Sequence, residues 1–241
     1  MENSWVEQLL DCQCRDDITD TVNRYLPGHG FDYWLYAIRV PLSATRKQHY
    51  AVHTFPDSWW EMCKKHYGQN IDPIAEHCKQ YITPVAWLSD DHSQFIDQLT
   101  PEGIRVIQQT GRVGVTGGIA VPLRDSGINW GSVMIGLKQK WHIEVLKNDI
   151  PFALHFAIYL HQAFCRIGHD CKENPAPNLT AREVECLSWA AEGKTSREIS
   201  QLLGISERTV VFHLQNASGK LGVFTRQQAI AHSIMLGIVS P

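Results

Sequence analysis

Apolar positions along the first two thirds of the chain follow two periods. Apolar residues three to four positions apart predict helices, and short runs rich in aromatic and β-branched residues predict strands. The predicted helices cover residues 4–14, 16–26, 56–67, 72–81, 100–111 and 143–168. The predicted strands cover residues 31–40, 48–55, 117–123 and 129–137, with a short buried extension at 84–87. Because the strands come in two close pairs, we expect an α+β fold, an α-β-α sandwich whose sheet has a concave face suited to a small apolar ligand.

The C-terminal part has a different pattern. Residues 193–221 read as two short helices joined by a tight turn, with Gly204 ending the first helix and Ser206 capping the second. So short a turn is typical of a helix-turn-helix, with a recognition helix that starts near Glu207. The alternative is a small helical bundle that does not contact DNA.

A polar, proline-rich stretch separates the two patterns. It predicts an N-terminal domain over residues 1–168, a linker over 169–178, and a C-terminal domain over 179–241. The C-terminal domain is expected to hold about four helices and no strand. Its first helix begins with Thr180 and, three residues on, Glu183, the pattern of a capping box.

Charge limits the kind of DNA binding to expect. The net charge is −3, and the chain from residue 168 onward carries seven basic and seven acidic residues. A general polyanion binder is therefore excluded, and DNA binding would depend on charge placement and on dimerisation.

Cysteine usage points to a reduced, cytosolic protein. The seven cysteines are odd in number and have no disulfide-framework spacing. Neither Cys12 with Cys14 nor Cys165 with His169 and Cys171 has a common zinc spacing, so we expect no metal. We expect no membrane segment and no cofactor.

The segment LTAREVECLSWAAEGKTSREISQLLGISERTVVFHLQNASGKLGV resembles the C-terminal DNA-binding domain of the LuxR family of bacterial transcription regulators. A phosphorylated receiver domain would need a parallel sheet and an acidic pocket, which the N-terminal pattern does not predict. The N-terminal residues resemble instead the autoinducer-binding domain of quorum-sensing members, through Pro56, Trp59, Asp72, Pro73, Trp87, Gly114, Gly118 and Pro122.

This resemblance implies an acyl-homoserine lactone bound between sheet and helices. Trp59 would donate its indole N–H to the lactone carbonyl, Asp72 would accept from the ligand's amide N–H, and Trp87 would pack on the lactone ring. The resemblance also places Leu35, Ala37, Phe55, Cys63 and Met134 in the pocket. The structural alternatives are core packing for the two tryptophans and helix capping for Asp72.

The sequence departs from the family pattern in three places. Phe55 and Cys63 stand where the family usually has Tyr, and Met134 stands where it has Ser or Thr, although Ser132 is close by. The changes at Phe55 and Met134 remove hydroxyl donors that relatives direct at the acyl carbonyl. A buried carbonyl without its donor costs roughly 1–3 kcal/mol. We therefore expect a non-standard lactone, a different molecule, or an ordinary lactone bound weakly or through a substitute donor such as His53.

In the C-terminal domain the resemblance places three side chains at base edges. Val211 would contact a thymine methyl group, Gln215 would read adenine, and Phe212 is either a base contact or a core residue. The candidates for phosphate contacts are Thr195, Ser196, Arg208, Asn216, Lys220 and Arg226. Gly219 replaces a residue that is often basic in relatives, and we expect modest DNA affinity at high salt.

The sequence thus predicts a homodimeric, ligand-responsive regulator that binds a palindromic double-stranded operator, with RNA polymerase as a further partner that the resemblance allows. The first alternative is an orphan or ligand-independent regulator whose pocket is filled by its own side chains or takes a non-lactone signal. The second is a lactone-hydrolysing enzyme that uses Cys63 and His66, and no residue pattern supplies its oxyanion donors.

Overall fold

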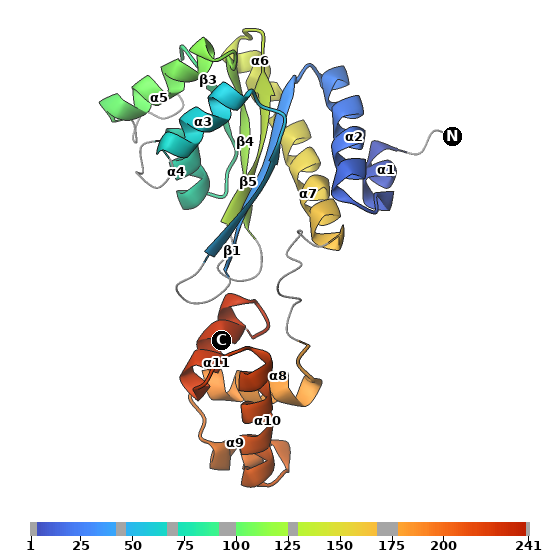
Figure 1. The fold of residues 1–241 in the computed structure, drawn as a ribbon, viewed down its shortest axis with the longest axis vertical. Helices are drawn as coiled ribbons and strands as arrows, with labels where there is room; N and C mark the ends of the chain where they lie inside the picture. The colour runs from blue at the N-terminus through green and yellow to red at the C-terminus, as the bar shows by residue number, and fades with distance from the viewer. Residues whose placement is uncertain are drawn as a thin grey trace. The chain divides into compact units, whose positions relative to one another are not determined.

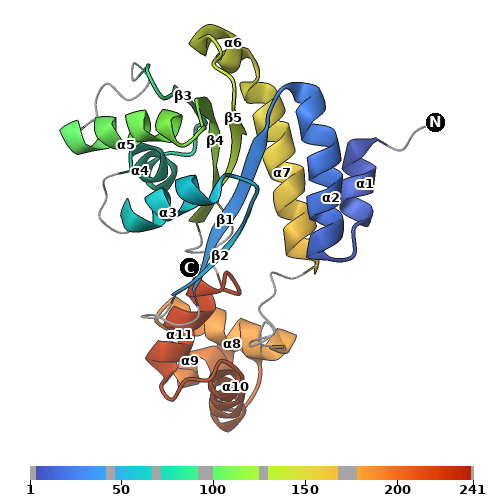
Figure 2. The ribbon, with the colours of Figure 1, turned by 45° about the horizontal axis from the view of Figure 1, so that its top comes forward.

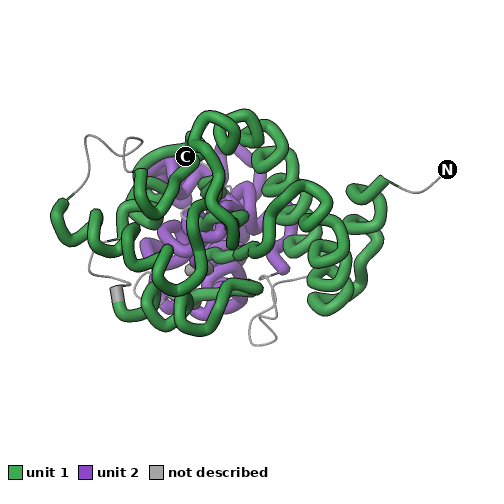
Figure 3. The backbone as a smooth tube through the Cα atoms, turned by 90° about the horizontal axis from the view of Figure 1, so that it is seen from above, with its two compact units in different colours: residues 1–38, 49–124, 130–169 green, residues 39–48, 125–129, 170–241 purple. Residues whose placement is uncertain are grey.

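The computed structural model describes residues 4–41, 47–66, 72–91, 100–124, 130–167 and 178–239. The chain divides into two compact units, one of residues 1–38, 49–124 and 130–169 and the other of residues 39–48, 125–129 and 170–241 (Figure 3). Most of the residues between the two strands of each predicted pair, and all but the last residue of the predicted linker at 169–178, lie outside the described residues. The domain limits drawn from the sequence therefore stay a prediction.

In the described residues of the first unit, five strands form one sheet. They are β1 (Tyr33–Pro41), β2 (Lys47–His53), β3 (Val85–Leu88), β4 (Gly117–Arg124) and β5 (Trp130–Leu137), in the order β2-β1-β5-β4-β3. The predicted neighbours β1 and β2 are adjacent, and β4 pairs antiparallel with β5, with Ala120 opposite Met134. The predicted extension at 84–87 is the edge strand β3, which places Trp87 opposite Gly118.

Helices cover both faces of this sheet (Figures 1 and 2). One face packs against α2 (Arg15–Tyr25) and α7 (Ile150–Ile167), and α1 (Trp5–Asp11) packs on these two helices. The other face packs against α3 (Asp57–His66), α4 (Pro73–Gln80) and α5 (Pro101–Arg112). A short 3₁₀ helix, η1 (Leu26–His29), follows α2. The predicted mixed helix–sheet architecture is confirmed.

Strand alternation divides the side chains of β1 between the two layers. Trp34 and Tyr36 face α2 and α7, where the Trp34 indole N–H donates to Asn23 Oδ1 at 2.8 Å and Tyr36 stacks on Phe164. Tyr33, Leu35 and Ala37 face the opposite way, because successive side chains of a strand point to opposite faces. The side chains on the two faces of the sheet therefore belong to two different layers of the core.

The single long helix predicted over 143–168 is wrong. The structure has α6 (Ile143–Asn148), a break at Asp149, and then α7. Pro151 explains the break, since proline lacks the backbone N–H that a helix continuing from α6 would have to donate. None of the helices in the described residues has the length and apolar character that crossing a membrane demands.

The second unit contains four helices within residues 178–239: α8 (Ala181–Ala191), α9 (Ser196–Leu203), α10 (Glu207–Lys220) and α11 (Arg226–Met235). Their buried faces meet in one apolar cluster that includes Leu187, Ile199, Val210 and Leu214. The all-helical architecture predicted for this part is confirmed.

Candidate ligand and DNA sites

The sheet face that packs on α3, α4 and α5 carries a cluster of apolar and aromatic side chains. Its buried members are Leu35, Phe55, Trp59, Ile74, Cys78, Val85, Trp87, Ile107, Val115, Ala120 and Met134. Tyr33, Ala37, Ala51, Trp60, Met62, Cys63 and Val113 pack against it, partly buried. All the pocket residues predicted from the sequence, apart from Asp72, belong to this set or pack against it.

Two polar atoms stand out inside this cluster. Among the described residues, neither the Trp59 nor the Trp87 indole N–H has a hydrogen-bond partner, although both are buried. Trp34, buried on the other face of the sheet, has its N–H satisfied by Asn23. An unpaired buried donor destabilises the folded state by about 1–3 kcal/mol. An acceptor from a bound molecule would remove this cost for an indole on the α3–α5 face.

Phe55 forms part of the same wall. It stacks on Trp59 with ring centroids 4.1 Å apart and lies 5.4 Å from the Tyr33 ring. A Cβ on Gly136 would come within 2.6 Å of the Phe55 ring, so the glycine makes room for it. Phe55 therefore extends the apolar wall beside Trp59 without adding a polar atom.

Asp72 is a helix cap, the structural alternative considered for it. Its Oδ1 accepts hydrogen bonds from the backbone N–H groups of Ile74 at 3.0 Å and Ala75 at 3.4 Å, at the start of α4. A carboxylate offers about four acceptor positions. Capping is therefore compatible with a ligand contact as well.

Two thiols lie close to this carboxylate. Burial, and then the negative charge of Asp72, raise the pKa of Cys63 well above its usual range. The same causes raise the pKa of Cys78 to about 12, although Arg124 opposes them. Both thiols stay protonated at neutral pH, which disfavours Cys63 as a nucleophile. The side chain of His66, its partner in the enzyme alternative, lies outside the described part of the structure.

His53 is a further polar group on this side. Alternation along β2 places it with Ala51 on the α3–α5 face, since Tyr50 packs on Phe164 of the opposite layer. Its ring lies 4.4 Å from Trp60, and its Nδ1 is buried with no partner among the described residues. Burial lowers the pKa of His53, while the Phe55 backbone and Asp57 work in the opposite direction.

The pleat of β5 decides which of its side chains reach the cluster. Met134 is buried in the cluster, and Ser132 and Gly136, each two residues away, share its face. A buried hydroxyl is thus present one pleat from Met134. Sequence reasoning missed Tyr33 and Trp60. Tyr33 has the same alternation as Leu35 and Ala37, which would have identified it.

The helix-turn-helix has the geometry that its sequence predicts. Thr195 caps α9 through a capping box with Glu198, and Gly204 ends that helix in the left-handed conformation, with φ of 66°. The Ser206 side chain accepts from the Thr209 backbone N–H at 3.1 Å and starts α10. The recognition helix therefore begins at Glu207, as expected.

The predicted base-contacting residues all lie on the solvent side of α10. Val211 is 38% exposed and Phe212 is 57% exposed, so Phe212 is not a core residue. Gln215 and Arg208 are exposed as well. These four side chains are free to meet a partner.

The phosphate candidates differ in what holds them. The Arg226 guanidinium donates to Ser196 Oγ at 3.4 Å and to the Lys194 carbonyl, which ties the starts of α9 and α11 together. Lys220 Nζ lies 2.8 Å from Glu183 Oε2. Thr195 is engaged in its capping box, and Asn216 is half-buried.

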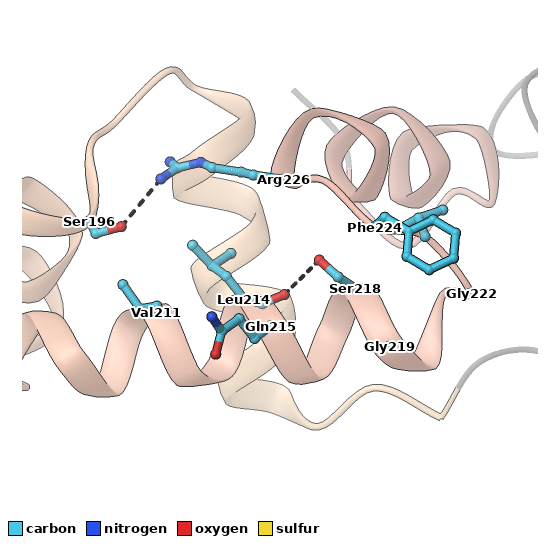
Figure 4. A pocket seen from close by; sticks show the side chains of 10 residues that line it. Ser196, Val211, Leu214, Gln215, Ser218, Gly219, Gly222, Phe224 and Arg226 are labelled. Carbon is cyan, nitrogen blue, oxygen red and sulfur yellow. Dashed lines mark hydrogen bonds between the residues drawn. The ribbon is translucent and has the colours of Figure 1, made fainter.

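An open groove runs beside the recognition helix in this unit. Val211, Gln215 and Gly219 line it along α10, and Ser196 and Arg226 line it from the neighbouring helices (Figure 4). Phe224, almost fully exposed, stands at its other end. The groove thus joins an apolar side chain, an amide and a guanidinium.

Comparison with protein families gives two matches that together span most of the chain. Residues 15–164 match the family model described as the autoinducer binding domain. Residues 177–233 match the model described as bacterial regulatory proteins, luxR family. The first match covers the cluster around Trp59 and Trp87, and the second covers the helix-turn-helix.

Individual proteins resemble the chain over nearly its full length. It is 31% identical over 240 residues to the transcriptional activator protein AhyR of Aeromonas hydrophila, covering 98% of this chain and 91% of AhyR. Its fold matches a crystal structure of Escherichia coli SdiA with a TM-score of 0.79 at 21% identity, over 99% of both chains. It also matches SdiA in complex with octanoyl-rac-glycerol, with a TM-score of 0.76 at 21% identity, over 95% of this chain and 91% of SdiA.

Proposed function

The chain belongs to the LuxR family of bacterial regulatory proteins with an autoinducer-binding domain, and from this membership we propose that it is a homodimeric regulator switched by an acyl-homoserine lactone. It is a DNA-binding transcription regulator and not an enzyme. The observation that supports the lactone is the buried indole N–H of Trp59, which has no partner among the described residues and lies in an apolar cluster with Trp87.

The proposed ligand fits the polar atoms of the cluster. An acyl-homoserine lactone offers a lactone carbonyl, an amide carbonyl, one amide N–H and an apolar tail. Trp59 donates to the lactone carbonyl, Asp72 accepts from the amide N–H while it caps α4, and Trp87 packs on the lactone ring. The apolar tail lies among the apolar side chains of the cluster, which include Leu35, Ala37 and Met134.

The acyl carbonyl needs a different donor from the one that relatives use. Phe55 and Met134 have no hydroxyl group. We propose that His53 takes this role, because its buried Nδ1 lies on the ligand side of β2 without a partner among the described residues. A neutral imidazole with its proton on Nδ1 is a suitable donor.

A thermal-shift experiment on the full chain tests the proposal. Binding only to the folded state raises the melting temperature by mass action. We expect acyl-homoserine lactones to raise it and Trp59→Phe to reduce the rise, whereas His53→Phe should weaken binding by up to about tenfold, the worth of one hydrogen bond. No rise with any lactone would contradict the lactone proposal.

A specific observation favours a second ligand class. Phe55 and Met134 make the acyl-carbonyl end of the cluster less polar than the family pattern implies, and the similar protein SdiA has been solved with octanoyl-rac-glycerol. An acylglycerol therefore belongs in the same thermal-shift panel. Mass spectrometry of small molecules extracted from protein purified from its native host separates the two classes, and an empty extract together with no shift favours the ligand-independent alternative.

For the DNA-binding half we propose a palindromic operator bound by two copies, because one helix-turn-helix reads half a site. The domain limits at 168 and 179 and the linker between them belong to this proposal. Limited proteolysis should cut within 169–178 and release two stable fragments. Sedimentation of the liganded protein should show a dimer, and a monomer that binds its operator tightly would contradict the proposal.

A further inference from the structure

The solvent side of the recognition helix α10 has an unusual composition for a DNA-reading surface. Helical spacing brings to this side Arg208, Val211, Phe212, Gln215 and Gly219. The opposite side is buried through Val210, Leu214 and Ala217. The residues that meet the major groove are thus defined by the fold.

The chemistry of this surface restricts which bases it can read. Guanine is most often recognised by Arg or Lys, which donate to its O6 and N7 atoms. After Arg208, at the start of the helix, no position on this side carries a cationic side chain. Lys220, the next cation along the helix, lies beside Glu183 and off this side.

Apolar side chains fill the middle of the surface instead. Val211 and Phe212 are 38% and 57% exposed. An exposed aliphatic or aromatic side chain in the major groove has one specific target, the C5-methyl group of thymine. Gln215, one turn further along, is suited to adenine, where its amide can donate to N7 and accept from the N6 amino group.

The neighbourhood of these residues supports a close approach. Val211 and Gln215 line the same groove, and Gly219 adds no side chain to it, with no atom within 4 Å of the position that a Cβ would take (Figure 4). Arg226, which bonds to Ser196 across the groove, places a cation on its rim. Bases can therefore approach the apolar positions directly while the rim faces phosphate.

We propose that α10 reads the operator through thymine methyl groups at Val211 and Phe212 and through an adenine at Gln215, so that the centre of each half-site consists of A·T pairs. This inference rests on the proposed DNA-binding function. It concerns which bases are read, and that function can hold without it.

The test uses DNA in which single atoms are changed. Sequences that bind the full chain are first selected from a random duplex library, in the presence of any lactone that raises its melting temperature. Each thymine of the selected half-site is then replaced by deoxyuridine, which lacks only the methyl group. We expect binding to weaken about fourfold at one or two positions, the effect of withdrawing one methyl group from the interface. Replacing an adenine by 7-deazaadenine should weaken binding at one further position.

Protein variants assign each effect to a residue. Val211→Ala or Phe212→Ala should remove the sensitivity to deoxyuridine at one position, and Gln215→Ala should remove the sensitivity to 7-deazaadenine. Leu202→Ala is the matched control, since Leu202 is an exposed apolar residue of α9, outside the recognition helix, and its loss should leave every sensitivity unchanged. Circular dichroism checks that each variant is folded.

The outcomes separate this inference from the proposed function. A selected operator whose affinity is the same with thymine and deoxyuridine at every position overturns the methyl readout and leaves DNA binding intact. Sensitivity that persists unchanged in both Val211→Ala and Phe212→Ala overturns the assignment. If no sequence is enriched, the proposed operator binding fails, and this inference fails with it.

Discussion

Phe55 and Trp59 stack face to face on the α3–α5 face of the sheet, with ring centroids 4.1 Å apart and planes 23° from parallel. The Trp59 indole N–H is buried without a partner among the described residues, and Phe55 brings no polar atom to it. The pair therefore combines a buried N–H donor that lacks an acceptor with an aromatic ring that has no polar atom to supply one. Most of the predictions for the ligand site depend on this combination.

Restoring a hydroxyl group at position 55 should strengthen lactone binding. We expect Phe55→Tyr to lower the dissociation constant of an acyl-homoserine lactone by about fivefold, because one more hydrogen bond to a buried carbonyl is worth about 1 kcal/mol. Titration calorimetry measures the change, with an alkane-tailed ligand that lacks the amide carbonyl as the control. Nanomolar lactone binding that is identical in both proteins would show that the acyl carbonyl gains nothing from a donor at position 55.

Removing the Trp59 donor should affect the liganded protein far more than the empty one. In Trp59→Phe, the cavity left by the smaller ring is offset by removal of an unpaired buried N–H, so the free energy of unfolding without ligand should change by less than about 1 kcal/mol. The rise in melting temperature that a lactone causes should be clearly smaller in Trp59→Phe than in the wild type.

Trp34→Phe is the matched control for that variant. Trp34 donates to Asn23 on the opposite face of the sheet, and Asn23 is exposed, so loss of the indole removes one hydrogen bond whose acceptor can turn to water. We expect this variant to lose about 0.5–1.5 kcal/mol without ligand for that bond and to keep its lactone response. A reversed pattern between the two variants would place the ligand on the other face.

The apolar cluster that holds the proposed ligand site follows from local patterns and from the family resemblance. The resemblance supplied Trp59, Asp72 and Trp87, whose ligand contacts stay a prediction, and the alternation of β1 places Leu35 and Ala37 in the same cluster. The position of Phe55 against Gly136 was not predictable. It depends on β1 lying beside β5, a neighbour about a hundred residues away, and no local pattern determines such a pairing.

Gly136→Ala should test how tightly that pairing is packed. The new methyl carbon would lie 2.6 Å from the Phe55 ring and 3.4 Å from Tyr33 Cβ. We expect a loss of about 1–3 kcal/mol in the free energy of unfolding, as for other overpacked core sites. Denaturant unfolding measures it, and Gly219→Ala, where the added carbon meets nothing within 4 Å, is a control that should not destabilise the protein.

The cysteines should divide by reactivity. Cys63 and Cys78 are held protonated by burial and by Asp72, whereas Cys14 and Cys165 are exposed. We expect iodoacetamide at pH 7.5 to label the exposed pair first in the native protein, and all cysteines after unfolding. Peptide mass spectrometry gives the order in which the cysteines are labelled. Early labelling of Cys63 would contradict this prediction and would favour the enzyme alternative.

One error of sequence interpretation has a plain physical cause. The helix predicted over 143–168 has an apolar pattern on both sides of Asp149, and the backbone chemistry of Pro151 ends one helix and starts another. For Phe212 the sequence left a core position and a base contact open, and the structure excludes the core position, because the buried side of α10 is formed by Val210 and Leu214. A hydrophobic pattern predicts that a helix has a buried face. Packing against the neighbouring helices determines which residues lie on that face.

Acid should weaken the DNA-binding unit through one ion pair. Glu183 of α8 is 4% exposed at its side chain and meets Lys220 of α10, which is 39% exposed. Although burial works against it, hydrogen bonds from Lys220 and Thr180 lower the pKa of Glu183. A carboxyl whose pKa is lower in the folded state stabilises that state above its unfolded pKa, roughly 4.3, and loses this contribution as the pH falls through the folded-state pKa.

The unit should therefore unfold more easily as the pH falls below about 4.3, and Glu183→Gln should flatten that dependence without abolishing folding. Lys220→Met should cost about 1–3 kcal/mol at pH 7, because it leaves a buried carboxylate without its cation while the half-exposed lysine itself loses little. The double variant should recover part of that loss, since the buried group is then neutral. Hydrogen exchange of peptides from α8 and α10 in urea, read by mass spectrometry, measures the unfolding of this unit in all four full-length proteins from pH 3 to pH 7. Equal acid sensitivity in wild type and Glu183→Gln would show that the pair does not control the stability of this unit.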